Sequence, residues 1–189
     1  MYLNQLVGAM DETVTYVALP EDSSDSLEAL ASRIRNGEIE SLLILGGNPV
    51  YDAPAEMNWK ALQQSVPEVI RYGYYFDETS LEAGLNIAAT HFLESWGDGR
   101  TLDGTHVPVQ PMILPLFDAM SELELLARVA GQPLTDPYGM VLRTFTDSYN
   151  ASNKDFQAFL SNGFRPDSGY QKLSAGGMAP TRVREQLGG

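Results

Sequence analysis

The feature that most constrains this fold is a short, unbroken apolar run at residues 41–45, which lies between a charged segment and a turn that begins with Gly46. An apolar run without alternation is typical of a β-strand that is buried on both faces. Residues 26–36 precede it with apolar side chains at helical spacing, and Gly37 suits the left-handed position that ends a helix. This order predicts parallel α/β structure, in which ligands bind beyond the carboxyl ends of the strands.

The chain continues with the same alternation of helix and strand. A helix is predicted over residues 59–65, ending before Pro67, and a strand rich in β-branched and aromatic residues over 68–75. If the two strands pair in parallel, their carboxyl ends meet at one crevice. We therefore predict an α/β fold, a three-layer sandwich with a mainly parallel sheet. The remaining predicted elements are a helical turn at 79–85, a strand at 86–93, an extended segment at 107–114, and helices at 121–130, 138–148 and 153–160.

Length and composition predict one domain with a loose end. A chain of 189 residues, 43% of them hydrophobic, is long enough to bury a sizeable core. We place the α/β domain at residues 1–165. In residues 166–189, Gly and Ser accumulate without apolar periodicity, so we predict a flexible tail or linker there.

Charge and the absence of cysteine exclude several classes of function. Twelve basic residues against 25 acidic ones give a formal net charge of −13, which repels nucleic acid and anionic lipid surfaces. No apolar run reaches the roughly 18 residues that a membrane-spanning helix needs, so no direct membrane insertion is predicted. Because the chain has no cysteine, it cannot form disulfides or supply thiolate ligands to zinc or iron–sulfur clusters.

Two polar turns follow the two best-defined strands and form the candidate ligand site. Backbone N–H groups and the amide of the first turn could hold a nucleotide or phosphate, and the carboxylates of the second could grip a ribose or base. A plain strand-to-loop turn and capping of the next helical turn are the alternatives, because the GxGxxG spacing and the Walker lysine are missing. The candidate residues are Gly46, Gly47, Asn48, Pro49, Asp77, Glu78 and Thr79.

Neither a metal site nor a catalytic constellation is predicted. His91 and Glu94 have the spacing of a metal-ligand pair on a helix, but this stretch is predicted to run from strand to loop, and no third ligand is near. His106 is the second histidine, and a satisfied polar contact accounts for both. Neighbouring carboxylates such as Asp77 and Glu78 seldom converge on one substrate atom, so acid–base catalysis is not expected from them. The aromatic side chains of residues 72–76 could stack on a base or pack two faces of a sheet.

Several sequence blocks, in their order, resemble the molybdopterin oxidoreductases. The similarity covers roughly residues 3–165, and it is narrowest to the molybdopterin-oxidoreductase-like iron–sulfur subunit of alternative complex III, a quinol:cytochrome c oxidoreductase. The combined order is more specific than any single block. The blocks are LLILGGNPVYDAP at 42–54, DET at 77–79, HFLESWGD at 91–98, VQP at 109–111 and PLF at 115–117.

The resemblance implies a dinucleotide-binding domain of the formate dehydrogenase/DMSO reductase type. In cofactor-bearing relatives, a turn such as 46–49 and an acidic turn such as 77–79 help to hold the guanosine ends of molybdopterin guanine dinucleotide. In the alternative complex III branch this cofactor is understood to be lost, and the region serves as a scaffold beside a domain that carries iron–sulfur clusters. The blocks HFLESWGD and VQP favour that branch, so we expect no cofactor on this chain itself.

Three functional hypotheses remain at this point. The first is a non-catalytic scaffold domain of such a subunit, inactive alone, whose partners are the remaining domains of its polypeptide and other subunits of a membrane-associated respiratory complex. Because Met1 directly precedes a mid-domain-like sequence, we expect a fragment of an exported, periplasmic-facing oxidoreductase subunit. The second is a domain that helps bind molybdopterin guanine dinucleotide in an active molybdenum enzyme. The third is a free-standing nucleotide-binding or carbohydrate-active protein outside this family.

Overall fold

The computed structural model describes residues 2–9, 12–21 and 23–173, which divide into two compact units. The larger unit comprises residues 23–99 and 107–163, and the smaller unit contains the beginning of the chain, residues 100–106 and the chain from 164 onward. The proposed boundary at residue 165 stays a prediction, and most of the predicted tail, from residue 174 on, lies outside the described residues. In the described part of the chain, no helix has both the length and the apolar character needed to cross a membrane.

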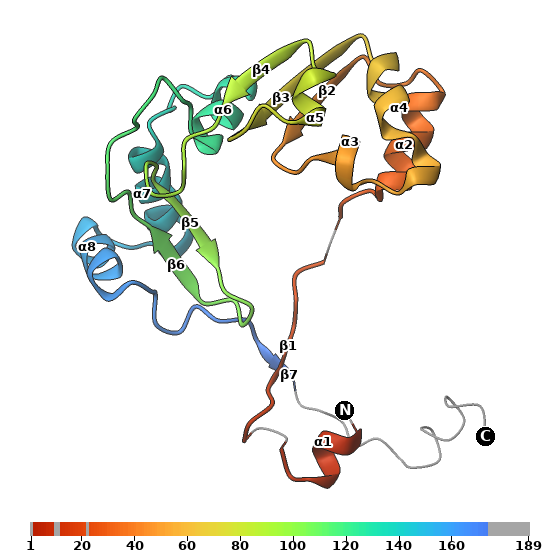
Figure 1. Ribbon diagram of the computed structural model, residues 1–189. Helices are drawn as coiled ribbons and strands as arrows, with labels where there is room; N and C mark the ends of the chain where they lie inside the picture. Colours follow the sequence, from red (N-terminus) through yellow and green to blue (C-terminus); the bar gives the residue numbers. More distant parts are fainter. Residues whose placement is uncertain (1, 10–11, 22, 174–189) are drawn as a thin grey trace. The chain divides into compact units, whose positions relative to one another are not determined.

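A three-stranded parallel sheet lies at the centre of the larger unit. Its order is β2 (Ser41–Leu45), β3 (Glu68–Gly73) and β4 (Leu85–Ala88), as Figure 1 shows. The mixed α/β class and the parallel pairing of the first two predicted strands are therefore confirmed. Both later strands are shorter than predicted, because the chain leaves the sheet after Gly73 and, beyond β4, only Ala89 continues the pairing, through a bridge to Met120.

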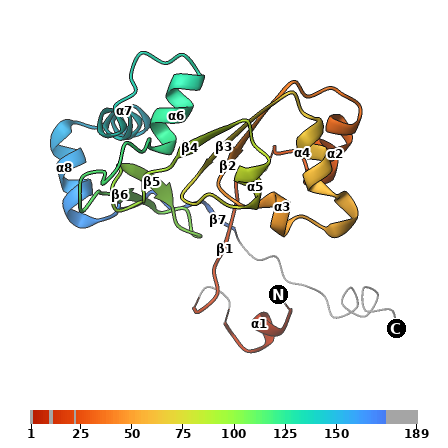
Figure 2. The same ribbon diagram turned by 45° about the horizontal axis from the view of Figure 1, so that its top comes forward.

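Helices α2 (Leu27–Arg35) and α4 (Trp59–Ser65) cover one face of the sheet and lie side by side in Figures 1 and 2. Ser26 caps α2, because its hydroxyl accepts a hydrogen bond from the Ala29 amide at 3.2 Å. Residues of these helices and inward-facing residues of β2 and β3 form the main hydrophobic core. Its buried members are Ala31, Ile34, Leu42, Ile44, Met57, Trp59, Leu62, Val66 and Val69.

The opposite face of the sheet is also apolar, but it is only partly covered. The parallel register aligns one side chain from each strand in two rows across this face. Tyr72 is buried there, whereas Leu45 is 38% exposed and Leu85 is 52% exposed. The rows consist of Leu43, Ile70 and Leu85, and of Leu45, Tyr72 and Ile87.

Short helices connect the strands at the end of the sheet where the candidate site lies. These are α3 (Pro49–Asp52), the 3₁₀ helix η1 (Ala55–Met57) and α5 (Glu78–Leu81). Helices α3 and α5 lie next to each other in both ribbon views, although 25 residues lie between Asp52, which ends α3, and Glu78, which begins α5. Each follows directly from the turn that ends a neighbouring parallel strand.

The second half of the larger unit has an aromatic core of its own. Helices α6 (Glu122–Val129), α7 (Pro137–Tyr149) and α8 (Asn153–Asn162) confirm the three helices predicted there. Each begins at a polar cap, and Ser152 forms a full capping box with Asp155. Val141, Phe145, Phe156 and Phe159 form the buried centre. The strands β5 (Gly97–Arg100) and β6 (His106–Val109) form a separate two-stranded sheet, and the extended segment predicted to reach residue 114 pairs only as far as Val109.

The smaller unit is formed by short segments that are distant in sequence. It contains α1 (Tyr2–Leu6), and β1 (Tyr16–Val17) pairs antiparallel with β7 (Lys172–Leu173). Arg100 donates hydrogen bonds to the carbonyls of Gly104 and Ser168, at 2.6 and 2.9 Å. These contacts join residues 100–106 to the segment that begins at residue 164.

Candidate functional site

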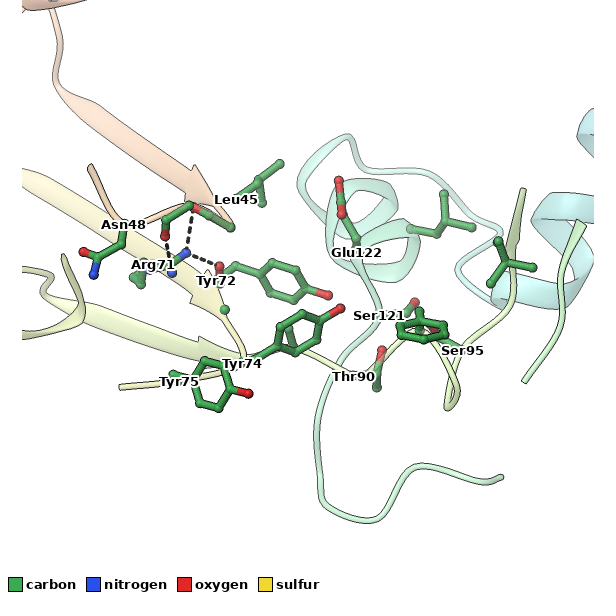
Figure 3. A pocket seen from close by; sticks show the side chains of 18 of the residues that line it. Leu45, Asn48, Arg71, Tyr72, Tyr74, Tyr75, Thr90, Ser95, Ser121 and Glu122 are labelled. Carbon is green, nitrogen blue, oxygen red and sulfur yellow. Dashed lines mark hydrogen bonds between the residues drawn. The ribbon is translucent and has the colours of Figure 1, made fainter. Parts of the chain in front are cut away.

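A pocket of about 700 Å³ opens at the carboxyl ends of β2 and β3, within the larger unit (Figure 3). One wall consists of the strand ends and the turns that follow them, and the other consists of residues 89–98 and the beginning of α6. The parallel pairing of Leu45 with Tyr72 brings the two strand ends together. The shared crevice predicted from the sequence is therefore present.

Arg71 organises the strand-end wall. Its side chain is only 5% exposed, and its guanidinium donates to the carbonyls of Gly46 and Gly47 at 3.0 and 2.6 Å. It also donates to the Tyr72 carbonyl and forms an ion pair with Asp77 at 2.8 Å. The dashed lines in Figure 3 mark hydrogen bonds of this cluster. The turn at Gly46 and Gly47 is therefore held in place by the buried Arg71, to which both of its carbonyls point.

Three glycines surround this guanidinium, two in the turn after β2 and one at the end of β3. Gly46 and Gly47 have φ angles of 65° and 63°, in the left-handed region that glycine adopts without strain. A β-carbon at Gly73 would lie 2.7 Å from an Arg71 guanidinium nitrogen, so a side chain at this position would displace the cation. Sequence reasoning missed Arg71, although an arginine inside an apolar strand was a visible signal that a buried partner exists.

Asn48, Glu78 and Thr79, all predicted site residues, contact one another. The Asn48 amide donates to Glu78 Oε2 at 2.7 Å, and its carbonyl oxygen accepts from the Thr79 hydroxyl at 2.7 Å. The same hydroxyl oxygen accepts from the Val50 amide at 3.1 Å. Thr79 is fully buried, so the two turns are fastened together by a threonine that faces the protein interior.

Asp77 caps helix α5, as the alternative interpretation of the sequence proposed. Its Oδ1 accepts from both the amide and the hydroxyl of Ser80 at 2.9 Å, while Oδ2 accepts from Arg71. Burial would raise the pKa of Asp77, but the hydrogen bonds from Arg71 and Ser80 outweigh it and lower this pKa to about 2. The Asn48 amide likewise lowers the pKa of Glu78. Both carboxylates are therefore charged at neutral pH and are poor general bases.

The ionisable residues that line the pocket give it a negative charge. Arg71 is neutralised by Asp77, and the other charged side chains in the lining are Asp52, Asp98 and Glu122. The Asn48 amide is engaged by Glu78 and Thr79. Pro49 starts α3; it has no backbone N–H to donate to a ligand, and its carbonyl accepts from the Ala53 amide at 3.1 Å.

Two further hydroxyl groups line the pocket, that of Tyr72 at the end of β3 and that of Thr90 on the opposite wall, and Thr90 was not singled out from the sequence. Tyr72 donates to the Met120 carbonyl at 2.9 Å. Burial raises the pKa of Tyr72 to about 12, and the negative charge of Glu122 adds to this rise. Thr90 is 5% exposed, and its hydroxyl has no hydrogen-bond partner of normal geometry, although it lies near enough to Tyr72 to oppose the rise in pKa.

His91 lies in a loop beyond the end of β4, so it is not on a helix, as expected, but it is also not in the strand that was predicted over residues 86–93. Its Nδ1 accepts from the Leu93 amide at 3.3 Å, and its own amide donates to Glu94 Oε2 at 3.1 Å. Its ring contacts Phe92 and Tyr74, with centroids 4.2 and 5.8 Å away. His106 is buried in the smaller unit. Among the residues that the structure describes, no three histidine or carboxylate side chains are grouped so that they could hold a metal ion.

The pocket, its polar strand-end wall and its aromatic opposite wall define the candidate site. Comparison of the sequence with known protein families and with curated proteins finds no match.

Proposed function

We propose that this chain is a non-catalytic scaffold domain of a molybdopterin-oxidoreductase-like iron–sulfur subunit in a respiratory quinol-oxidising complex. The observation that carries the proposal is the internal bonding of the residues that would hold a dinucleotide in cofactor-bearing relatives. The Asn48 side chain bonds to Glu78 and Thr79 of the second turn, and Asp77 pairs with Arg71, which in turn donates to the carbonyls of the first turn. These groups already stabilise the fold, so a ligand that used them would first have to break hydrogen bonds within the protein, two of them partly buried.

Electrostatics also favour the scaffold over the dinucleotide-binding alternative. A pyrophosphate is stabilised by cations or by free backbone N–H groups. In this pocket the lining cation, Arg71, is paired with Asp77, and the remaining charged residues of the lining are acidic. A dinucleotide phosphate would therefore meet like charge, which costs binding free energy.

Exposed apolar side chains support a role in packing against other protein. The loop at residues 112–117 presents several of them, and the Leu93 carbonyl accepts from the Met112 amide at 2.8 Å, which holds the start of the loop. Contiguous exposed apolar surface of this kind marks interaction sites in soluble domains. The exposed fractions are 77% for Met112, 85% for Leu114, 67% for Leu116 and 80% for Phe117.

The partly covered face of the sheet offers a second contact surface. A further layer on Leu43, Leu45 and Leu85 would complete a three-layer sandwich of the formate dehydrogenase/DMSO reductase type. In the proposed function that layer, and the partner of the loop at 112–117, come from other domains of the same subunit or from neighbouring subunits of the complex.

Calorimetric titration with GMP and GDP tests the proposal against its alternative. We expect no heat of binding at millimolar nucleotide. Micromolar binding that Asn48→Ala abolishes would instead establish a dinucleotide site. Asn36→Ala is the matched control, because Asn36 is the C-cap of α2, away from the pocket, and its side-chain amide donates to the exposed Glu38 at 3.0 Å.

The complete reading frame of the gene provides a second, independent test. The proposal expects it to encode cysteine-rich cluster motifs in the same polypeptide. A reading frame without such motifs would contradict membership in an iron–sulfur subunit, whatever the outcome of the titration.

A further inference from the structure

The pocket wall opposite the strand ends contains a buried polar group that the protein itself does not satisfy. Thr90 is 5% exposed and lines the pocket, and its hydroxyl makes no hydrogen bond of normal geometry. Buried hydroxyl groups are nearly always hydrogen-bonded, so an exception that lines a cavity is open to a partner from the cavity, either water or a ligand. In Figure 3 the Thr90 hydroxyl lies on the side of the pocket toward which the phenols of Tyr72 and Tyr74 point.

The neighbouring oxygen atoms need a donor rather than an acceptor. Tyr72 donates its proton to the Met120 carbonyl at 2.9 Å, so its phenol oxygen presents only lone pairs to the pocket. Glu122, at the start of α6, adds a carboxylate that acts electrostatically on Tyr72. A ligand that donates several hydrogen bonds and carries positive charge would satisfy these groups together.

Aromatic side chains provide the second half of the recognition. Tyr72, Tyr74, Tyr75, Phe92 and Trp96 all line the pocket. The faces of such rings attract ammonium and guanidinium groups and also cover the alkyl chains that carry them. Combined aromatic and carboxylate lining is the chemistry that selects an organic cation over an anion or a neutral molecule.

We infer that this pocket binds a primary ammonium group on an alkyl chain, as at the end of a lysine side chain or in a free alkylamine. The ammonium N–H groups donate to Thr90 and to the Tyr72 phenol oxygen, the negative charge of Glu122 attracts the ammonium, and the alkyl chain lies against the aromatic rings. This inference rests on the chemistry of the pocket and not on the proposed scaffold function, which would stand if it failed.

The chain's two tryptophans allow a direct test by ¹H–¹⁵N NMR, with one reporter and one internal control. Trp96 lines the pocket, whereas Trp59 is 4% exposed in the core and its indole N–H donates to Gln63 at 3.2 Å. We expect Nα-acetyl-lysine methylamide to shift the Trp96 indole signal, with a dissociation constant on the order of millimolar, as expected of a single side chain. The Trp59 signal should not move.

Three comparisons make the result decisive. The Nε-acetylated form of the same probe has no charge and should produce no shift of Trp96. Glu122→Gln should weaken binding roughly fivefold or more because the attracting negative charge is lost. Glu124→Gln removes the same charge from the same helix, but Glu124 pairs with Arg128 outside the pocket and its loss should leave binding unchanged.

n-Butylammonium distinguishes the two sources of the ligand. Binding of both probes shows that the pocket recognises the ammonium end alone, whereas binding of the lysine derivative only assigns the site to a protein side chain, and binding of butylammonium only assigns it to a free amine. If neither probe moves Trp96 at about 50 mM, or if the neutral probe binds equally well, the inference is wrong.

Discussion

The two walls of the pocket use polar groups in opposite ways. On the strand-end wall, Thr79 is fully buried and its hydroxyl joins Asn48 to Val50. On the opposite wall, Thr90 is almost as buried, and its hydroxyl has no partner of normal geometry. The same residue type is thus structural on one side of a cavity and available to a ligand on the other. The comparison shows that burial alone does not identify a binding residue, and the inferred role of Thr90 rests on its unpartnered hydroxyl together with its place in the pocket lining.

The largest expected effect is that of removing the cation from the strand-end wall. Arg71→Met leaves Asp77 and the loop carbonyls without their partner, so we expect the free energy of unfolding to fall by about 3–5 kcal/mol. Urea-induced unfolding measures the change. Arg143→Met is the control, because the Arg143–Asp147 pair is 66% and 70% exposed and its loss should cost less than about 1 kcal/mol. Equal effects of the two substitutions would contradict a central role for Arg71.

Ionisation of Asp77 should contribute about 2 kcal/mol to the free energy of unfolding, and acid should remove this contribution. Its pKa is about 2 in the folded protein against 3.8 as the ordinary value, so the folded state holds its charge more strongly than the unfolded state. The resulting stability, about 2 kcal/mol, is present above pH ~4 and is lost as the pH falls toward ~2.

Stability measured as a function of pH in the wild type and in Asp77→Asn isolates this contribution from those of the other carboxylates. The variant should be less stable at neutral pH and should lose less stability between pH ~4 and ~2. Parallel curves for the two proteins would show that Asp77 is not coupled to folding in the way the geometry indicates.

A pair of isosteric substitutions compares the two walls directly, with a smaller effect. Thr79→Val leaves the Val50 amide without its partner and removes the shorter of the two hydrogen bonds that the Asn48 carbonyl oxygen accepts, so we expect a loss of about 1–2 kcal/mol. Thr90→Val removes a hydroxyl that has no protein partner, so we expect a change within about 0.5 kcal/mol, or a slight gain. Thermal unfolding of both variants under identical conditions provides the measurement, and a cost at Thr90 as large as that at Thr79 would refute the distinction.

Much of the fold followed from local sequence patterns. The apolar run at residues 41–45 predicted β2, a polar start with apolar spacing predicted α2, and signals at the helix ends predicted α6 and the end of α8. These signals are local, because each depends on residues within one element. β5 was missed because Gly97–Arg100 has no apolar alternation, and this segment is a strand only through its pairing with β6.

The candidate site was predictable only in part, for a physical reason. Position after parallel strands was enough to place Asn48 near Glu78, since parallel strands end on the same edge. The role of Arg71 was not predictable from spacing, because its partners include two carbonyls that are 24 and 25 residues away in the sequence. Whether the seven predicted residues hold a cofactor stays a prediction.

The close approach of the Arg71 guanidinium to the backbone at Gly73 couples two positions on the same strand. A side chain at position 73 needs the guanidinium to move away from its hydrogen-bond partners or to be absent, while a protein that keeps this arginine in place at 71 must keep the space beside it open. Among homologues, we therefore expect these two positions to vary together, with glycine retained wherever the arginine is present and replaced wherever it is lost. Replacing Arg71 first and Gly73 second should avoid the clash, whereas replacing Gly73 first should give a protein in which the new side chain displaces the guanidinium.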